Sequence, residues 1–82
     1  MGYHLRKIKK GTFGEISKIA EEYEEFLDAE GRGAKLMELV ELSDLIGAIQ
    51  GYLHKYHPTI RLEDLQYMAE LTKSAFEEGS RK

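Results

Sequence analysis

The stretch from residue 34 to residue 57 restricts the fold more than any other part of the chain. Large aliphatic residues recur through it at helical spacing, and on a wheel of about 100° per residue they cover well over half of the circumference. They are Leu36, Leu39, Val40, Leu42, Leu45, Ile46, Ile49 and Leu53. A helix with this pattern must be buried on more than one side. Since Pro58 cannot continue it, the helix is predicted to span 34–57.

Two more helices are predicted, one on each side of the apolar helix. Thr12 and Glu15 have the spacing of a capping box, which predicts a first helix over 12–30. Acidic residues in the first turn and one apolar stripe predict a third helix over 61–78. The Gly31-Arg32-Gly33 break is short, so the first two helices should fold back on each other as an αα-hairpin.

These elements predict an all-α fold in which 1–82 form one domain: an αα-hairpin plus a third helix. A chain of 82 residues buries only a modest core. The first and third helices each offer one narrow apolar stripe, which is too little to cover the helix at 34–57. We therefore expect a helical bundle that is completed on dimerisation or higher assembly, as a homodimer or homotetramer.

Composition excludes several classes of protein. The chain has no cysteine, so it has neither disulfides nor thiolate metal sites, which fits a reducing compartment. No apolar run approaches the length of a membrane span, so we expect a soluble, cytoplasmic protein without a membrane partner. A net charge of −3 makes a nucleic acid polymer an unlikely partner.

The N-terminal segment 1–11 departs from this acidic balance. It carries a basic cluster ahead of the first helix, made of Arg6, Lys7, Lys9 and Lys10. Such a cluster is typical of a solvated arm, but it also suits an arm that faces phosphate or a partner.

Four carboxylates stand out on the predicted hairpin. Glu22 and Glu25 lie three residues apart in the first helix, and Glu41 and Asp44 repeat that spacing in the second. Residues three apart share a helix face, so an antiparallel hairpin can bring the two pairs together. Converging carboxylates repel one another unless a cation lies between them. Ligation by oxygen alone suits a hard divalent ion, Mg²⁺ first and Mn²⁺ second.

The residues of the second helix favour a metal site over the alternative, in which the acids form a solvated charged face. No Lys or Arg lies between Leu36 and Leu53 to pair with the acids of that helix. Burying an unpaired carboxylate costs several kcal/mol or raises its pKa until it becomes neutral. A bound cation would avoid that cost.

The pattern Glu21-Glu22-x-x-Glu25 followed by Glu41-x-x-Asp44 resembles the signature of the MazG-type all-α nucleoside triphosphate pyrophosphohydrolases, a family that includes the all-α dUTPases. The resemblance covers roughly residues 13–56. The tail LTKSAFEEGSR also looks like that of the small phage-type members. The resemblance implies a hydrolase acting on acid anhydrides, which uses Mg²⁺ to convert a (deoxy)nucleoside triphosphate and water into the monophosphate and pyrophosphate.

The predicted site follows from the spacing and the resemblance together. Glu22, Glu25, Glu41 and Asp44 would be the metal ligands, and Glu21 or Glu38 would orient or deprotonate the attacking water. Lys18 and Lys73 are the candidate phosphate contacts among the available cations, and nothing in the sequence selects the nucleotide. The alternative function is a non-catalytic helical dimerisation or adaptor module with the same fold.

Overall fold

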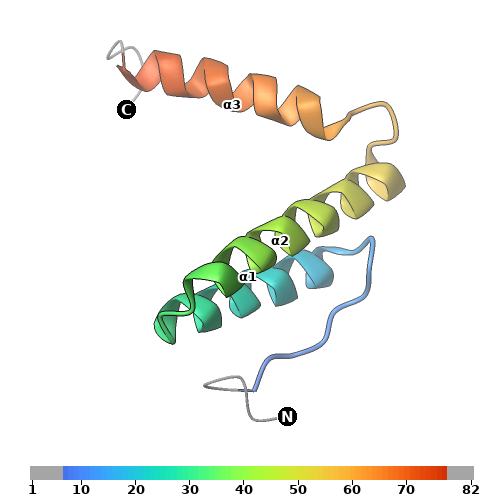
Figure 1. The fold of residues 1–82 in the computed structure, drawn as a ribbon. Coiled ribbons are helices and arrows are strands. Elements are labelled where there is room, and N and C mark those ends of the chain that lie inside the picture. Colours follow the sequence, from blue (N-terminus) through green and yellow to red (C-terminus); the bar gives the residue numbers. More distant parts are fainter. Residues whose placement is uncertain (1–6, 78–82) are drawn as a thin grey trace.

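The computed structural model describes residues 7–77, and in this part of the chain the secondary structure is entirely helical. Three helices follow in order: α1 spans Ile16–Gly31, α2 spans Lys35–Tyr56 and α3 spans Leu62–Glu77 (Figure 1). The predicted all-α class and its three helices are confirmed. Residues 1–6 of the predicted arm, and residue 78 at the predicted end of the third helix, lie outside the described residues.

The turn between α1 and α2 is built around Gly33. Its φ is +68°, in the left-handed region that favours glycine. The Ala34 N–H donates to the Ala29 carbonyl at 3.0 Å, and the Gly33 N–H donates to the Glu30 carbonyl at 3.0 Å. This pair of bonds is a Schellman motif, which satisfies the last carbonyls of α1. The chain then reverses, and α2 runs back along α1 (Figure 1).

The start of α1 differs from the prediction, because the capping box does not form. The helix begins at Ile16, four residues after Thr12. The Thr12 N–H donates to Ser17 Oγ, and the Glu15 carboxylate accepts hydrogen bonds from Lys55 and Tyr56 of α2. Gly14 has a φ of +90°, which no α-helix accommodates, so the helix cannot start before it.

The end of α2 and the start of α3 agree with the sequence to within one residue. The helix α2 ends at Tyr56, two residues before the proline. At the start of α3, the Arg61 N–H donates to Asp64 Oδ2 at 2.8 Å, and the Asp64 N–H donates to the Arg61 carbonyl at 3.0 Å. These reciprocal bonds cap the third helix. Beyond its junction with α2, α3 extends away from the hairpin (Figure 1).

The interior of the hairpin is polar. The buried apolar side chains are small or few, namely Ala29, Ala48 and Leu53, whereas the buried charged ones are Glu21, Glu22, Asp28 and Glu41. The radius of gyration is 15.1 Å. A compact domain of this length would have roughly 12 Å. The described chain is therefore an open arrangement that keeps its charges inside.

Most large aliphatic residues of α2 are exposed in the single chain. Leu53 is buried, but the exposed set on this helix comprises Leu36, Met37, Leu39, Val40, Leu42 and Ile46. The helices α1 and α3 therefore do not bury α2 on more than one side, as was predicted for the complete bundle. The helix α1 covers one side of α2, and α3 turns away. Among the described residues, no helix combines the length and the apolar character needed to cross a membrane.

Candidate metal centre

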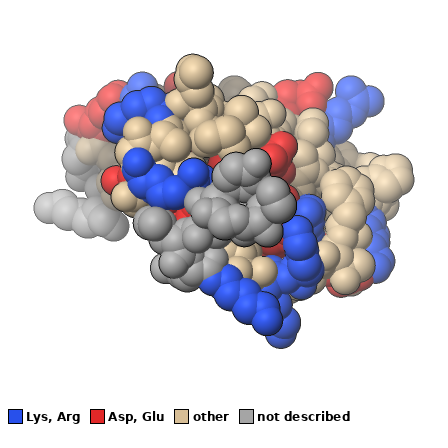
Figure 2. All heavy atoms as spheres, turned by 60° about the horizontal axis from the view of Figure 1, so that its bottom comes forward, with Lys and Arg blue, Asp and Glu red and all other residues tan. Residues whose placement is uncertain are grey.

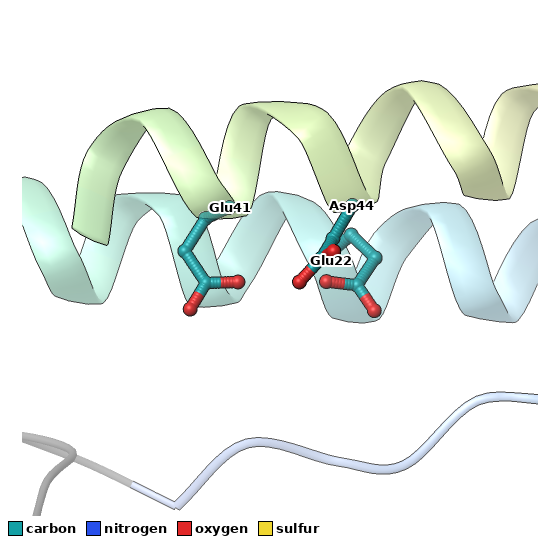
Figure 3. A group of neighbouring side chains, drawn as sticks. All are labelled: Glu22, Glu41 and Asp44. Carbon is teal, nitrogen blue, oxygen red and sulfur yellow. The ribbon is translucent and has the colours of Figure 1, made fainter. Parts of the chain in front are cut away.

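Three of the four predicted ligands converge on one side of the hairpin. Glu22 comes from α1, and Glu41 and Asp44 come from α2 (Figure 3). One carboxylate oxygen from each residue lies within 4.8 Å of the other two. Glu22 and Glu41 are buried, whereas Asp44 is exposed. We call these three residues the acidic cluster.

Small residues and the glycine turn account for this convergence. Ala29 of α1 and Ala48 of α2 are almost fully buried, at 0% and 2% exposed. Without bulky side chains at these positions the two helices can approach closely. The turn at Gly33 makes them antiparallel, so the second turn of α1 lies beside the middle of α2. Glu41 and Asp44 share a face because they are three residues apart.

Lys18 partly balances the charge of the cluster. Its Nζ lies 2.9 Å from Glu22 Oε2 and 3.1 Å from Glu21 Oε1. The hydrogen bonds to Glu22 and Glu21 raise the pKa of Lys18 above its ordinary value, so the ammonium stays charged. The predicted phosphate contact Lys18 thus lies at the edge of the site, and its single charge is shared between Glu22 of the cluster and Glu21.

The two predicted bases differ in their surroundings. Burial alone would raise the pKa of Glu21, but hydrogen bonds from the Gly11 N–H and from Lys18 lower it overall. Glu38 lies one turn before Glu41, and its Oε2 is buried without a hydrogen bond from any described residue. That oxygen forms an ion pair with Lys35, whose Nζ lies 3.6 Å away. Glu38 Oε2 thus has no hydrogen-bond donor among the described residues, whereas Glu21 Oε1 already accepts two hydrogen bonds.

Glu25 and Lys73 are the predicted residues that the single chain does not bring to the cluster. Glu25 is partly buried on α1, one turn beyond Glu22, and it does not belong to the group of oxygens within 4.8 Å. Lys73 lies on α3, which extends away from the hairpin (Figure 1). Their predicted roles as a ligand and as a phosphate contact stay predictions.

Asp28 and Arg32 form a buried ion pair that the predicted site does not include. Asp28 Oδ2 accepts a hydrogen bond from Arg32 Nε at 2.9 Å, and the aspartate side chain is 0% exposed. Their spacing of four residues on a helix was the available signal, because oppositely charged residues at this interval are neighbours. The pair neutralises an acid close to the turn.

Comparison with known proteins adds no family assignment. No family model, no curated protein and no solved structure matches the chain.

Proposed function

We propose that this chain is a Mg²⁺-dependent nucleoside triphosphate pyrophosphohydrolase, which converts a ribo- or deoxynucleoside triphosphate and water into the monophosphate and pyrophosphate. One observation carries the proposal: carboxylate oxygens of Glu22, Glu41 and Asp44, from two different helices, lie within 4.8 Å of one another. The spacing that led to this expectation is the one that resembles the MazG-type signature. No comparison assigns the chain to that family, so the cluster supports the metal site, and the pyrophosphohydrolase reaction is proposed from the resemblance.

The donor set fits a hard divalent ion. All three side chains offer oxygen, which is the ligand type that Mg²⁺ and Mn²⁺ prefer. Two of the carboxylates are buried in the hairpin, where an ion would offset their mutual repulsion. Glu25 is proposed as a fourth ligand. When bound, the metal would offset part of the charge of the triphosphate and polarise the phosphorus under attack.

The side chains around the cluster would position the water and the leaving group. In the proposed step, the water oxygen bonds to the α-phosphorus, and the bond from that phosphorus to the bridging oxygen breaks. The electron pair leaves with pyrophosphate, and the water proton passes to a carboxylate. Glu38, one turn before Glu41, is proposed as the base because Glu21 Oε1 already accepts hydrogen bonds from the Gly11 N–H and Lys18. Lys18 would stabilise charge on the phosphate oxygens beside Glu22.

A panel assay tests the proposal directly. Each common and modified nucleoside triphosphate is incubated with the protein, with and without Mg²⁺, and both pyrophosphate and orthophosphate are measured. We expect Mg²⁺-dependent pyrophosphate release. Glu41→Gln should lower turnover by at least about a hundredfold. Loss of a residue that binds the metal directly should lower turnover more than loss of a residue that only hydrogen-bonds to a metal ligand. Glu70→Gln, an exposed substitution on α3, is the control. Orthophosphate and a nucleoside diphosphate as products would refute the assignment.

We further infer that the working unit is at least a dimer. The exposed aliphatic side chains of α2 support this, as do Tyr67, Met68, Leu71 and Phe76 of α3, which are all at least half exposed. A soluble monomer seldom exposes a contiguous apolar patch of more than a few hundred Å². A twofold pairing of α2 and α3 with a second copy would cover these side chains and would allow Lys73 of one copy to approach the other.

Sedimentation equilibrium at micromolar concentration tests the assembly. A homodimer or homotetramer should sediment at a multiple of the 9.4 kDa chain mass. A single species at the chain mass would show that the exposed apolar faces need no second copy. A non-catalytic adaptor module would also assemble through these faces. It would be preferred if the panel assay found no pyrophosphate from any nucleotide.

A further inference from the structure

The segment that precedes α1 is fixed to that helix by its backbone. The Gly11 N–H donates to Glu21 Oε1 at 2.9 Å, and the Thr12 N–H donates to Ser17 Oγ at 3.0 Å. Glu21 is 4% exposed, so its bond to Gly11 is shielded from water. Gly11 also has no room for a side chain, since a Cβ would lie 2.2 Å from the Ser17 carbonyl oxygen. The end of the arm is therefore held closely against α1.

The same carboxylate connects the arm to the acidic cluster. Lys18 Nζ bridges Glu21 Oε1 at 3.1 Å and Glu22 Oε2 at 2.9 Å. Lys10 Nζ lies 3.6 Å from Glu21 Oε2. A continuous set of contacts thus runs from the arm, through Glu21 and Lys18, to a predicted metal ligand.

The three carboxylates of the acidic cluster point toward the side of the hairpin on which the arm runs (Figure 3). Basic side chains gather on this face of the molecule, with acidic ones between them (Figure 2). Lys9 and Lys10 help to line a pocket of about 240 Å³ between the arm and α1, together with Ser17, Ala20, Glu21 and Glu24. The arm and the cluster therefore share one face, on which cations lie close to acids.

The lysines of the arm are available to a ligand. The Lys10 side chain is 87% exposed, so its ammonium is open to solvent although Nζ lies 3.6 Å from Glu21 Oε2. Lys9 is exposed as well. Flexible ammonium groups act as point charges that suit phosphate oxygens. A single divalent ion held by three carboxylates would leave much of the negative charge of a triphosphate without a partner. The arm that carries these lysines runs on the side of the hairpin toward which the cluster points (Figure 3).

We propose that residues 7–11 form a phosphate-binding strap: Glu21 holds the strap against α1, and Lys9 and Lys10 bind oxygens of the triphosphate chain. This inference rests on the proposed function, since it takes the triphosphate to bind at the acidic cluster. Glu21 is then a positioning residue, which acts on the substrate through the strap. The solvated arm and the partner-facing arm, both compatible with the sequence, are the alternatives that the experiment must exclude.

Calorimetry with two probes separates the strap from the metal site. Mg²⁺ alone tests the acidic cluster, and inorganic tripolyphosphate in saturating Mg²⁺ tests the strap. Lys9→Ala/Lys10→Ala should weaken tripolyphosphate binding by about tenfold or more, since hydrogen bonds to charged groups are strong, and should leave Mg²⁺ affinity unchanged. Arg61→Ala is the matched control, because Arg61 is an exposed cation that lies between α2 and α3 and not in the arm. It should leave both affinities unchanged.

Two substitutions of Glu21 test the tether. Glu21→Gln keeps an oxygen that can accept the Gly11 N–H, whereas Glu21→Ala removes it. Hydrogen exchange of the Gly11 amide, followed by NMR, should be slow in the wild type and in Glu21→Gln but fast in Glu21→Ala. Tripolyphosphate affinity should follow the same order, with Mg²⁺ affinity retained in all three proteins. If Glu21 were the base instead, Glu21→Gln would lose turnover while Glu21→Ala still bound tripolyphosphate normally.

The possible outcomes are distinct. If Mg²⁺ does not bind the wild type, the proposed function fails. If Mg²⁺ binds but tripolyphosphate does not, or if it binds the wild type and Lys9→Ala/Lys10→Ala equally, the strap is refuted and the metal site stands. A Gly11 amide that exchanges equally fast in the wild type and in Glu21→Ala would refute the tether.

Discussion

Replacing Asp44 with asparagine removes one negative charge from the acidic cluster and keeps the size of the side chain. Two unit charges 4.8 Å apart, the limiting separation in the cluster, repel by roughly 1 kcal/mol in water and by roughly 3 kcal/mol near a protein surface. Asp44 takes part in two such pairs, with Glu22 and with Glu41. Because Asp44 is exposed and Lys18 lies 2.9 Å from Glu22, solvent screening and this ammonium reduce the net effect to the lower limit or below it. Without metal, Asp44→Asn should therefore raise the free energy of unfolding by no more than about 1 kcal/mol.

Magnesium should reverse this order. At a free Mg²⁺ concentration about 100 times its Kd, a ligand that binds only the folded state stabilises it by about 2.7 kcal/mol. For a domain of this size that corresponds to a rise in Tm of roughly 10–20 °C. If the loss of a ligand weakens binding about a hundredfold, the same concentration stabilises Asp44→Asn by only about 0.4 kcal/mol. The variant should thus be the more stable protein without metal and the less stable one with it.

Thermal unfolding followed by circular dichroism, with and without Mg²⁺, measures both effects. Glu70→Gln also removes one negative charge, but from an exposed position on α3 outside the cluster. It should change the free energy of unfolding of the metal-free protein by less than about 0.5 kcal/mol. It should leave the response to Mg²⁺ unchanged. If Asp44→Asn is less stable than the wild type without metal and responds to Mg²⁺ equally, the three carboxylates are not a repulsive metal site.

Three further substitutions probe the hairpin. Gly51→Ala should expel the Phe13 ring, since a Cβ at Gly51 would lie 2.5 Å from a ring carbon. NMR contacts between the two residues should then disappear. The free energy of unfolding should change by less than about 1 kcal/mol, because alanine favours the helix. Gly33→Ala should cost about 1 kcal/mol in chemical denaturation, because Gly33 has a positive φ. Hydrogen bonds from Lys55 and then from Tyr56 hold the pKa of Glu15 below its ordinary value of 4.5. The stability that this carboxylate contributes is therefore present above pH 4.5 and lost as the pH falls through its folded pKa. An NMR titration should show that Lys55→Ala raises the pKa of Glu15.

The elements that follow from local chemistry could be predicted from the sequence. Gly33 and Pro58 fix where helices stop, because one permits a positive φ and the other lacks an N–H. The start of α1 could not be predicted in this way. Glu15 has the spacing of a capping box, but its carboxylate bonds to Lys55, which lies 40 residues away in sequence. A local motif competes with a tertiary contact there, and the contact prevails.

The candidate site was predictable to the extent that it depends on spacing within one helix. Glu41 and Asp44 share a face for that reason, and the turn brings Glu22 opposite them. Whether Glu25 joins them depends on how α1 is rotated about its own axis, and spacing within α1 does not determine this. The bond from Gly11 to Glu21 leaves no signal in the sequence either, because a backbone N–H is available at almost every residue.

The polar interior and the exposed apolar faces are two consequences of one arrangement. Once α1 and α2 approach through Ala29 and Ala48, the acidic residues beside those positions are enclosed and the aliphatic residues of α2 are directed outward. Enclosing those acids costs free energy that Lys18 and Arg32 offset in part, and exposing the aliphatic side chains to water also costs free energy. A single chain of this fold therefore carries two separate deficits. A divalent ion would relieve the first and a second copy the second, so metal binding and assembly should each raise stability, and the acidic cluster should persist in the assembled protein because the apolar faces lie outside it.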